Sequence, residues 1–592
     1  MSGARAVDGL RALARGALLL LAALLPFERI EPLAHLGPLQ LSSVELFLYL
    51  ALAAWGAALV AGWWAGERDL FARLRRAPRA HWAVIAFAAA LFVSAALAPA
   101  ARGPALKFAL RSAGGLLLYA AAADLLRAPE AVARTASSLV GGAFVAALLT
   151  IAEARTGGLG ELLRPFHLQT FEALGQTRAS GPFQYPNIAA MYLEALAPLA
   201  LALGTAAFAA RRSAGAWLGA LAVVLCVLLD GVLATASRAG LVGALALVGA
   251  LALVLARRAE GRAPALASVA AVLVVAALAS GSALAGRFRF WKDGEWYRAT
   301  IAQAGGAGAR LPPVLEPSSE ATESLELLNE GALPWRRSPP TPVALSYHWL
   351  DQGGRVVVFD GKRTFLPQDV YTGGQVQVRA VVRAPWRAGR YILWWDLVHE
   401  HTSWFSERGN PGLREEVVVS SGASGQLVPK GEDRPAPLGP GTGLVLPAPA
   451  GHDRLPRGEL WRGAVAAWRA HPWFGIGPDN FRHLSRQFLH RADTDERMHA
   501  NSLYFETLAD LGGVGLLALL AVIAALGAAA RRAAAVPATR LLALGVAAAL
   551  AAYLLHGVVD HFLEFTPTYA LFWLLAGMLV AMERQSETPL DA

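Results

Sequence analysis

Several short polar segments lie beside long apolar runs and hold the residue types that could do chemistry. Arg178 stands in TRASGPFQYPN, Arg238 in TASRAG and His499 in MHANSLYFE. Arginine stays charged at any working pH and presents a planar fork that suits phosphate oxygens, whereas histidine titrates near neutrality. These segments could therefore bind an anionic group and move a proton. The alternatives are that the two arginines only reach toward lipid headgroups and that His499 caps a helix.

Further ionisable residues are close together in the sequence. His556 and Asp560 of HGVVDHFLEF are one helical turn apart, as two metal ligands would be, and His561 follows them. Such a pair is more often a structural hydrogen bond, and no third ligand is evident. Lys107 and Arg111 are also one turn apart, and the sequence leaves open whether they face an anionic headgroup or a buried site.

The composition tells which kind of fold must position these residues. Of 592 residues, 55% are hydrophobic and only 16% charged, and the mean hydropathy is +0.42. A soluble protein would carry about 25% charged residues, while residues 287–460 hold no apolar run long enough to cross a bilayer. These figures exclude a soluble enzyme, a disordered chain and an outer-membrane barrel. They predict an all-α polytopic membrane protein with one large water-facing insert.

Apolar runs of about 20 residues, the length that spans a bilayer, predict twelve transmembrane helices. The runs lie near residues 10–27, 42–64, 82–99, 104–126, 131–153, 186–208, 216–234, 238–256, 265–285, 508–530, 540–557 and 567–583. The first follows three arginines, as a signal peptide would, but no cleavage site follows it, so we expect a retained span. The single cysteine, Cys226, excludes an intrachain disulfide.

Arginine-rich loops predict the orientation of these helices. Each loop of one alternate set carries arginine, namely 65–81, 127–130, 209–215, 257–264 and 531–539. Cytoplasmic loops are enriched in Lys and Arg, so we expect both termini in the cytoplasm. Much of the net charge of +9 is then a topology signal. All polar segments described above fall on the extracytoplasmic face. Because nucleotide sugars and ATP are absent there, chemistry on that face needs a substrate already activated, which points to lipid-linked intermediates.

The region between the ninth and tenth runs divides into three parts. Short alternating stretches separated by Gly and Pro predict a β-sandwich at about 315–420, flanked by linkers. Its Trp349, Trp394, Trp395 and Trp404 could stack on sugars, although core packing is the commoner role. Residues 458–507 then begin as an amphipathic helix that places Trp461, Val465 and Trp468 on one face, as suits the bilayer surface. The predicted domains are therefore 1–286, 287–457, 458–507 and 508–592.

Four motifs in this order, TRASGPFQYPN, SRAG, HPWFGIGPDNF and HANSLYFETLADLGGVGLLALL, resemble the O-antigen ligase and O-antigen polymerase superfamily. The resemblance implies a GT-C-like glycosyltransferase of the bacterial inner membrane with an active site in the periplasm. It implies no metal and no cofactor. Two arginines and a loop histidine of the family map onto Arg178, Arg238 and His499 as catalytic residues. We expect substrate-binding roles for polar residues nearby: Asn187, Asn480, Asn501, Lys107 and Arg111. The β-sandwich departs from the usually helical loop of the family and leaves the acceptor open.

The resemblance implies transfer of an undecaprenyl-pyrophosphate-linked glycan onto an acceptor hydroxyl, such as that of lipid A-core or another glycan. Two arginines would neutralise the pyrophosphate without a metal. His499, mostly neutral at pH 7 if its pKa is near 6.5, would deprotonate the hydroxyl, which attacks with inversion. The alternatives are a polymerase, a protein O-oligosaccharyltransferase, and a transporter or glycan-binding receptor. Few charges lie deep in the apolar runs, which favours an enzyme over a transporter, and nothing points to nucleic acid.

Overall fold

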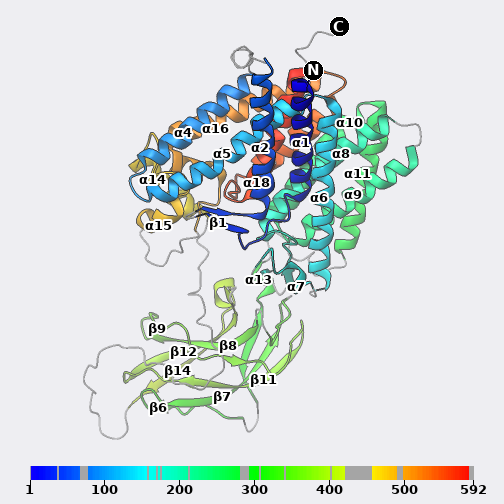
Figure 1. Ribbon diagram of the computed structural model, residues 1–592. Coiled ribbons are helices and arrows are strands. Elements are labelled where there is room, and N and C mark those ends of the chain that lie inside the picture. Colours follow the sequence, from blue (N-terminus) through cyan, green and yellow to red (C-terminus); the bar gives the residue numbers. More distant parts are fainter. Residues whose placement is uncertain are drawn as a thin grey trace. The chain divides into compact units, whose positions relative to one another are not determined.

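The computed structural model divides into two compact units (Figure 1). A helical unit comprises residues 1–171, 178–282 and 453–592, and a β unit comprises residues 172–177 and 283–452. The structure describes residues 2–36, 39–66, 78–156, 159–167, 171–173, 176–210, 214–280, 293–305, 308–331, 333–338, 342–400, 403–420, 457–489 and 498–585. The predicted linker at 429–451 lies outside the described residues.

Each of the twelve predicted apolar runs overlaps a helix in the described part of the chain. These are α1 Ser2–Leu24, α2 Ser43–Trp64, α4 Arg79–Leu97, α5 Arg102–Leu125, α6 Pro129–Thr156, α8 Pro186–Ala209, α9 Ala214–Ala234, α10 Arg238–Ala256, α11 Ala259–Ser280, α16 Leu503–Ala535, α17 Arg540–His556 and α18 Thr566–Gln585. Among the described residues, ten are long and apolar enough to cross a membrane, so the predicted count of twelve is too high by that criterion. Helix α17 has only 17 residues, and α1 carries Asp8, Arg11 and Arg15 in its first two-thirds.

Two of the spans form the interior of the helical unit. The apolar window of α18 is completely buried, and that of α8 is buried over 89% of its residues. Small residues let neighbouring helices approach α18 closely. A Cβ on Gly577 would stand 2.6 Å from the carbonyl oxygen of Tyr119 in α5, and one on Gly115 of α5 would stand 2.5 Å from the Trp573 ring. Helices α5 and α18 therefore pack through reciprocal glycines.

The connecting segments meet in two groups. One group holds the polar motifs: Arg178 bonds the Thr235 carbonyl, Asn187 bonds Asp560, and Asn480 bonds the Ala100 carbonyl. A second group ties the opposite helix ends, through the contacts Arg584–His81, Arg532–Glu583 and Gln585–Arg127. These contacts bring the segments of Arg178, Asn187 and Asn480 together, while the side of the membrane on which they lie stays a prediction.

The chain also forms four short α-helices and two small hairpins. The helices are α7 Gly160–Leu163, α13 Asp293–Trp296, α14 Arg457–Ala470 and α15 Phe481–Leu489. The hairpins pair β1 Ala34–Leu36 with β2 Leu39–Leu41, and β3 Phe171–Ala173 with β4 Gln176–Arg178. Helix α14 is the predicted amphipathic helix, and the segment after it is the HPWFGIGPDN motif.

The β unit consists of a larger and a smaller sheet. The larger runs in the order β10-β8-β12-β14-β6, with β13 beside β12 and β9 beside β8, and the smaller in the order β11-β7-β5. The strands are β5 Ala299–Gln303, β6 Val314–Leu315, β7 Glu320–Asn329, β8 Val343–Asp351, β9 Val356–Val358, β10 Thr364–Phe365, β11 Gln375–Arg383, β12 Gly389–His399, β13 Ser403–Trp404 and β14 Leu413–Val419. The inserted β module is confirmed, but it begins at Ala299 rather than near 315, because β5 pairs with β7.

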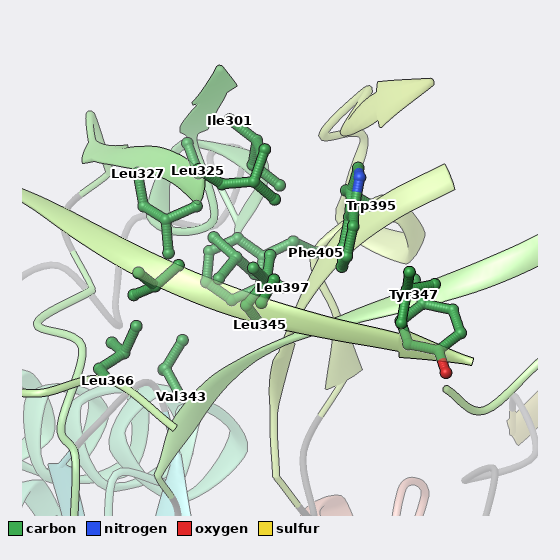
Figure 2. Close-up of a cluster of buried hydrophobic side chains, with 14 of the residues drawn as sticks. Ile301, Leu325, Leu327, Val343, Leu345, Tyr347, Leu366, Trp395, Leu397 and Phe405 are labelled. Carbon is green, nitrogen blue, oxygen red and sulfur yellow. The ribbon is translucent and has the colours of Figure 1, made fainter. Parts of the chain in front are cut away.

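Both sheets contribute to one hydrophobic core (Figure 2). Leu325 and Leu327 come from the smaller sheet, and Leu345 and Trp395 come from the larger one. Trp349 and Trp395 are completely buried, so the core interpretation holds for these two. Trp404 is also buried, whereas Trp394 is partly exposed and donates to the Pro411 carbonyl.

Candidate functional site

His499 lies between two carboxylates from different parts of the chain. Its Nδ1 is 2.8 Å from Oε1 of Glu506, in the first turn of α16, and its Nε2 is 2.7 Å from Oε2 of Glu564, in the α17–α18 loop. Burial alone would lower the pKa of His499, but the charges and hydrogen bonds of Glu506 and Glu564 outweigh it and raise the pKa well above 6.5. Burial would likewise raise the pKa of Glu564, yet the charge of His499 lowers it to about 2.

This arrangement changes the expected charge of His499. The sequence argument assumed an ordinary pKa, which leaves the ring mostly neutral at pH 7. Two carboxylates instead hold it as an imidazolium, because each favours the charged form. His499 can act as a base only when one of these carboxylates moves away. Neither Glu506 nor Glu564 was singled out as a partner of His499 from the sequence.

His561 is the second histidine of this cluster. Its ring centroid lies 5.7 Å from that of His499, and burial lowers its pKa. Ligand atoms of His499, Glu506 and His561 lie within 4.8 Å of one another, a spacing that could hold a metal ion. His561 Nδ1 is buried and has no hydrogen-bond partner in the part of the chain that the structure describes.

The residues His556 and Asp560, which are one turn apart, do not form a ligand pair. His556 Nδ1 is 2.6 Å from Glu194 Oε2 in the buried interior, whereas Asp560 accepts a hydrogen bond of 2.7 Å from Asn187 Nδ2. The two side chains therefore bond different partners, and the predicted side-chain hydrogen bond between them is not found among the described contacts. Asp560 Oδ1 also accepts from the backbone N–H of His561, at 2.9 Å.

Arg178 is held by two hydrogen bonds and joins this network. Its Nε donates to the Thr235 carbonyl at 3.1 Å, and its Nη2 donates to Asn187 Oδ1 at 2.8 Å. Asn187 sits in the first turn of α8, behind Pro186, whose fixed φ suits a helix start. Through Asn187 and Asp560, Arg178 is connected to the segment that carries His561 and Glu564. Asn187 is thus a positioning residue for Arg178.

Arg238 opens helix α10 beside the Arg178 segment. The Ser237 side chain caps this helix by accepting from the Gly240 N–H at 3.3 Å. The backbone N–H of Ala179 donates to the Ala234 carbonyl at 3.1 Å, which joins the two arginine-bearing segments. Both predicted arginines therefore stand in segments that contact each other.

A buried glutamate that the sequence reasoning missed fixes the turn after Arg178. Glu153 Oε2 accepts from the backbone N–H groups of Ser180, at 2.9 Å, and Gly181, at 2.7 Å. Gly181 has a φ of +55°, and a Cβ there would stand 2.2 Å from Thr150 Oγ1. Only glycine fits this turn. Its close contact with α6 fixes the position of the segment that carries Arg178.

The HPWFGIGPDN segment docks on a kink in α16. At Gly512 the backbone leaves the helix, with φ 67° and ψ −167°. The carbonyls of Ala509 and Asp510 accept instead from the N–H groups of Ile476, at 3.0 Å, and Gly477, at 2.9 Å. The approach is so close that a Cβ on Gly475 would stand 2.4 Å from the Asp510 carbonyl.

Asn480 and Asn501 differ from the expected substrate contacts. Asn480 is completely buried, and its Nδ2 donates to the carbonyls of Ala100, at 2.9 Å, and Ile476, at 2.8 Å. Its side-chain donors therefore hold the loop rather than a ligand. Asn501 has a φ of +49°, a left-handed conformation that asparagine tolerates. Asn480 Oδ1 is buried and has no hydrogen-bond partner among the described residues, so substrate contacts of Asn480 and Asn501 stay predictions.

Arg482 adds a third arginine to the site. Its guanidinium pairs with Asp479 at 2.6 Å, and the charges of Glu564 and Glu506 act on it as well. Burial raises the pKa of Asp479, and Arg482 partly offsets that rise. The sequence signal was present in the NFRHL part of the motif, but nothing there distinguished Arg482 from a surface residue.

One residue of the aromatic face predicted for α14 contacts α16. The Trp461 ring stacks on Phe505 of α16, with centroids 5.0 Å apart and planes 16° apart. The buried side of α14 holds Leu460, Ala464 and Ala467. Trp461 itself is partly exposed, and the position of this helix on the bilayer surface stays a prediction.

Lys107 and Arg111 line a separate cavity of about 330 Å³, here called the Lys107 pocket. Arg111 Nε pairs with Glu45 at 2.9 Å, and the guanidinium also contacts Thr566. Lys107 is exposed at the pocket. Arg111 is thus engaged in the protein, while Lys107 faces the cavity.

With this geometry established, comparison with known proteins identifies one part of the chain. Residues 447–520 match the family model described as O-antigen ligase. This segment is similar to O-antigen ligases and is here called the ligase domain. The family consists of membrane glycosyltransferases of the ligase and polymerase type, which use lipid-linked glycans. The resemblance inferred from the motifs is therefore confirmed.

The ligase domain contains α14, α15, His499 and the kinked start of α16. Arg178, Arg238 and the Lys107 pocket lie outside the matched residues, and their roles remain predictions. The fold nevertheless brings Arg178 and the ligase domain into one hydrogen-bonded group, through Asn187 and the 560–564 segment.

The other comparisons add little. No curated protein matches the chain. Among solved structures, an alkylpurine DNA glycosylase of Pseudomonas fluorescens, AlkC, bound to DNA with an abasic site analog, matches at 11% identity. The match covers 57% of this chain and 97% of that one, with a TM-score of 0.13. A similarity of this size carries no argument about fold or function.

Proposed function

We propose that this protein transfers a glycan from undecaprenyl pyrophosphate to an acceptor hydroxyl at the periplasmic face of the bacterial inner membrane, with both termini in the cytoplasm. The observation that supports it most is the ligase domain's His499, held between Glu506 and Glu564. Arg178 lies at the same end of the helices, connected to this cluster through Asn187 and Asp560. A proton acceptor and an anion-binding group are the two parts that such a transfer needs.

In this proposal, Arg178 and Arg238 bind the pyrophosphate of the donor. Two hydrogen bonds hold the Arg178 guanidinium, so little reorganisation is needed when charge develops on the leaving group. Arginine forks bind phosphate oxygens with paired hydrogen bonds. The arginines thus stabilise the pyrophosphate as the bond between C1 and its oxygen breaks.

His499 would act as the base once the acceptor reaches it. Glu506 holds Nδ1 and fixes the ring, while the acceptor hydroxyl displaces Glu564, which leaves with the Nε2 proton of the imidazolium and so frees the lone pair of Nε2. The hydroxyl oxygen then bonds to C1 from the face opposite the pyrophosphate, its proton passes to Nε2, and the pyrophosphate leaves with the bonding electron pair. This in-line displacement inverts the anomeric configuration.

We propose that the reaction needs no metal and no cofactor. The ligand spacing of His499, Glu506 and His561 is compatible with a metal ion. However, a proton and a metal compete for the same imidazole lone pair. The raised pKa of His499 favours the proton, and the two carboxylates already neutralise the charge there.

The test is replacement of His499 by Ala in the full-length protein, in a strain that lacks the native copy. We expect loss of transfer while lipid-linked donor accumulates and donor binding remains. His483→Ala, in α15 of the same domain, is the matched control and should retain transfer. Wild-type transfer by His499→Ala would exclude the proposed base.

The glycan profile of the deletion strain separates the acceptor classes. A ligase leaves uncapped lipopolysaccharide with accumulated lipid-linked polymer. A polymerase leaves product capped with a single repeat, and a protein O-oligosaccharyltransferase leaves unmodified protein. We place the ligase first because the matching family model is that of the O-antigen ligase.

A further inference from the structure

The Lys107 pocket has the charges of a ligand site that the proposed mechanism does not use. Its volume of about 330 Å³ lies at the small end of the range for small-molecule sites, about 300–1,000 Å³. That size fits a monosaccharide or disaccharide. Its walls come from the segment before α2, from α5, from the turn before α8 and from the start of α18.

Among the described residues, two cationic side chains that line the pocket have no carboxylate partner. In the part of the chain that the structure describes, no carboxylate pairs with the side chains of Arg29 or Lys107, although both line the cavity. Arg111, by contrast, is neutralised by Glu45. A site with two unpaired cations at its surface favours an anionic ligand.

Glu28 has side-chain hydrogen bonds to Ser42 and Thr566, and its other carboxyl oxygen is buried at the pocket. Its Oε1 is buried and accepts no hydrogen bond within the described residues. Burial raises the pKa of Glu28, more than Arg111 lowers it. A carboxyl oxygen in this position can bond a ligand hydroxyl, and buried polar atoms usually have a partner. Phe183 and Phe565 supply apolar walls.

The pocket shares two segments with the proposed transfer site. Glu564 contacts His499, and the next residue, Phe565, lines the pocket. Gln184 lines the pocket three residues before Asn187, which holds Arg178. The Tyr185 and Phe565 rings, 5.8 Å apart, close these two segments against each other. The pocket wall thus includes the residue that directly follows the carboxylate that the acceptor has to displace.

We propose that the Lys107 pocket binds the acceptor saccharide through an anionic substituent, a phosphate or a carboxylate, held by Arg29 and Lys107. Glu28 bonds a hydroxyl of the same sugar. This inference rests on the proposed function, and it names the acceptor class that the ligase domain alone leaves open. The same chemistry would also suit a phospholipid headgroup, so the test must separate the two sources.

Binding is measured with the full-length protein in nanodiscs of zwitterionic phosphatidylcholine. The probes are glucose 6-phosphate and galacturonate, each against its neutral counterpart, glucose or galactose. We expect the anionic probes to bind roughly tenfold more tightly, and Lys107→Gln or Arg29→Gln to remove that preference. Arg102→Gln, on the exposed first turn of the same helix, is the control and should keep it. Equal binding of charged and neutral sugars would overturn the proposal.

A second set of nanodiscs contains anionic phosphatidylglycerol. If the headgroup is the true ligand, the sugar probes fail to bind even without this lipid, and Lys107→Gln loses co-purifying lipid instead. That result also overturns the acceptor proposal.

Arg178→Ala distinguishes the pocket from the proposed function. It should abolish transfer and leave sugar binding unchanged. If the wild type binds the anionic sugars but catalyses no transfer, the proposed function is wrong, while the proposal that the pocket binds an anionic sugar is retained.

Discussion

Replacing Glu564 by Gln should move the pH dependence of transfer toward acid. His499 must be neutral to accept a proton, and Glu564, 2.7 Å from its Nε2, favours the charged ring. In the wild type, kcat/KM therefore rises with pH up to the raised pKa of His499. Removing this negative charge lowers that pKa, so the rise occurs at lower pH.

The size of the shift follows from the distance and the exposure. Two unit charges about 4 Å apart interact by about 4 kcal/mol at an effective dielectric constant of about 20. At about 1.4 kcal/mol per pKa unit, this sets a ceiling of about 3 units. The Glu564 side chain is 23% exposed, and Gln retains a hydrogen bond to the ring. Water screening therefore reduces the shift to about 1–2 units.

The assay is kcat/KM from pH 5 to pH 10 with purified protein and a fluorescent lipid-linked donor. Glu161→Gln, which changes an exposed glutamate paired only weakly with Arg164, is the control and should leave the profile in place. If the acidic limb of the kcat/KM profile of Glu564→Gln is unchanged, or lies at higher pH, then His499 is not a base whose pKa is raised by Glu564.

Three further outcomes test other parts of the site. Asn187→Ala should raise KM for the donor by about tenfold, because a hydrogen bond to a charged group is worth about 1.5–3 kcal/mol, with a smaller effect on kcat; an unchanged KM would contradict the positioning of Arg178. Dialysis against EDTA should leave transfer unchanged, whereas loss of transfer that zinc restores would show that the His499 cluster binds a metal. Gly475→Ala should lower the melting temperature, because the left-handed backbone of Gly475 costs about 1–2 kcal/mol with any other residue and the new Cβ would clash with the Asp510 backbone. An unchanged melting temperature would show that the loop adapts.

Local sequence predicted the helices because bilayer-length apolar runs leave few alternatives for the backbone. It also found the segments of Arg178 and His499, whose residue types are unusual beside such runs. The start of α16 at Leu503 was missed, because its first turn carries Glu506 and so falls outside an apolar window. Strand β5 was missed because five residues become a strand only through pairing with β7.

The partners of the site residues could not be predicted for a physical reason. Glu564 follows His499 by 65 positions, and Glu153 precedes Gly181 by 28. Such pairings depend on how helices pack, which periodicity does not encode. The charge state of His499 depends on these partners, so an argument from its ordinary pKa could not anticipate it.

The docking of the HPWFGIGPDN segment on the α16 kink uses main-chain groups on both sides. The contacts from Ile476 and Gly477 to the kinked helix join backbone N–H to backbone C=O. Two side chains add to these contacts, because the Asp510 carboxylate accepts from the N–H groups of Asp479 and Phe481 and the Asn480 amide bonds two carbonyls. The geometry therefore depends on the glycines and on these two residues, and little on the other side chains of the loop. Substitutions elsewhere in the loop should then leave the position of His499 unchanged, provided that Gly475, Gly477, Gly512, Asn480 and Asp510 remain.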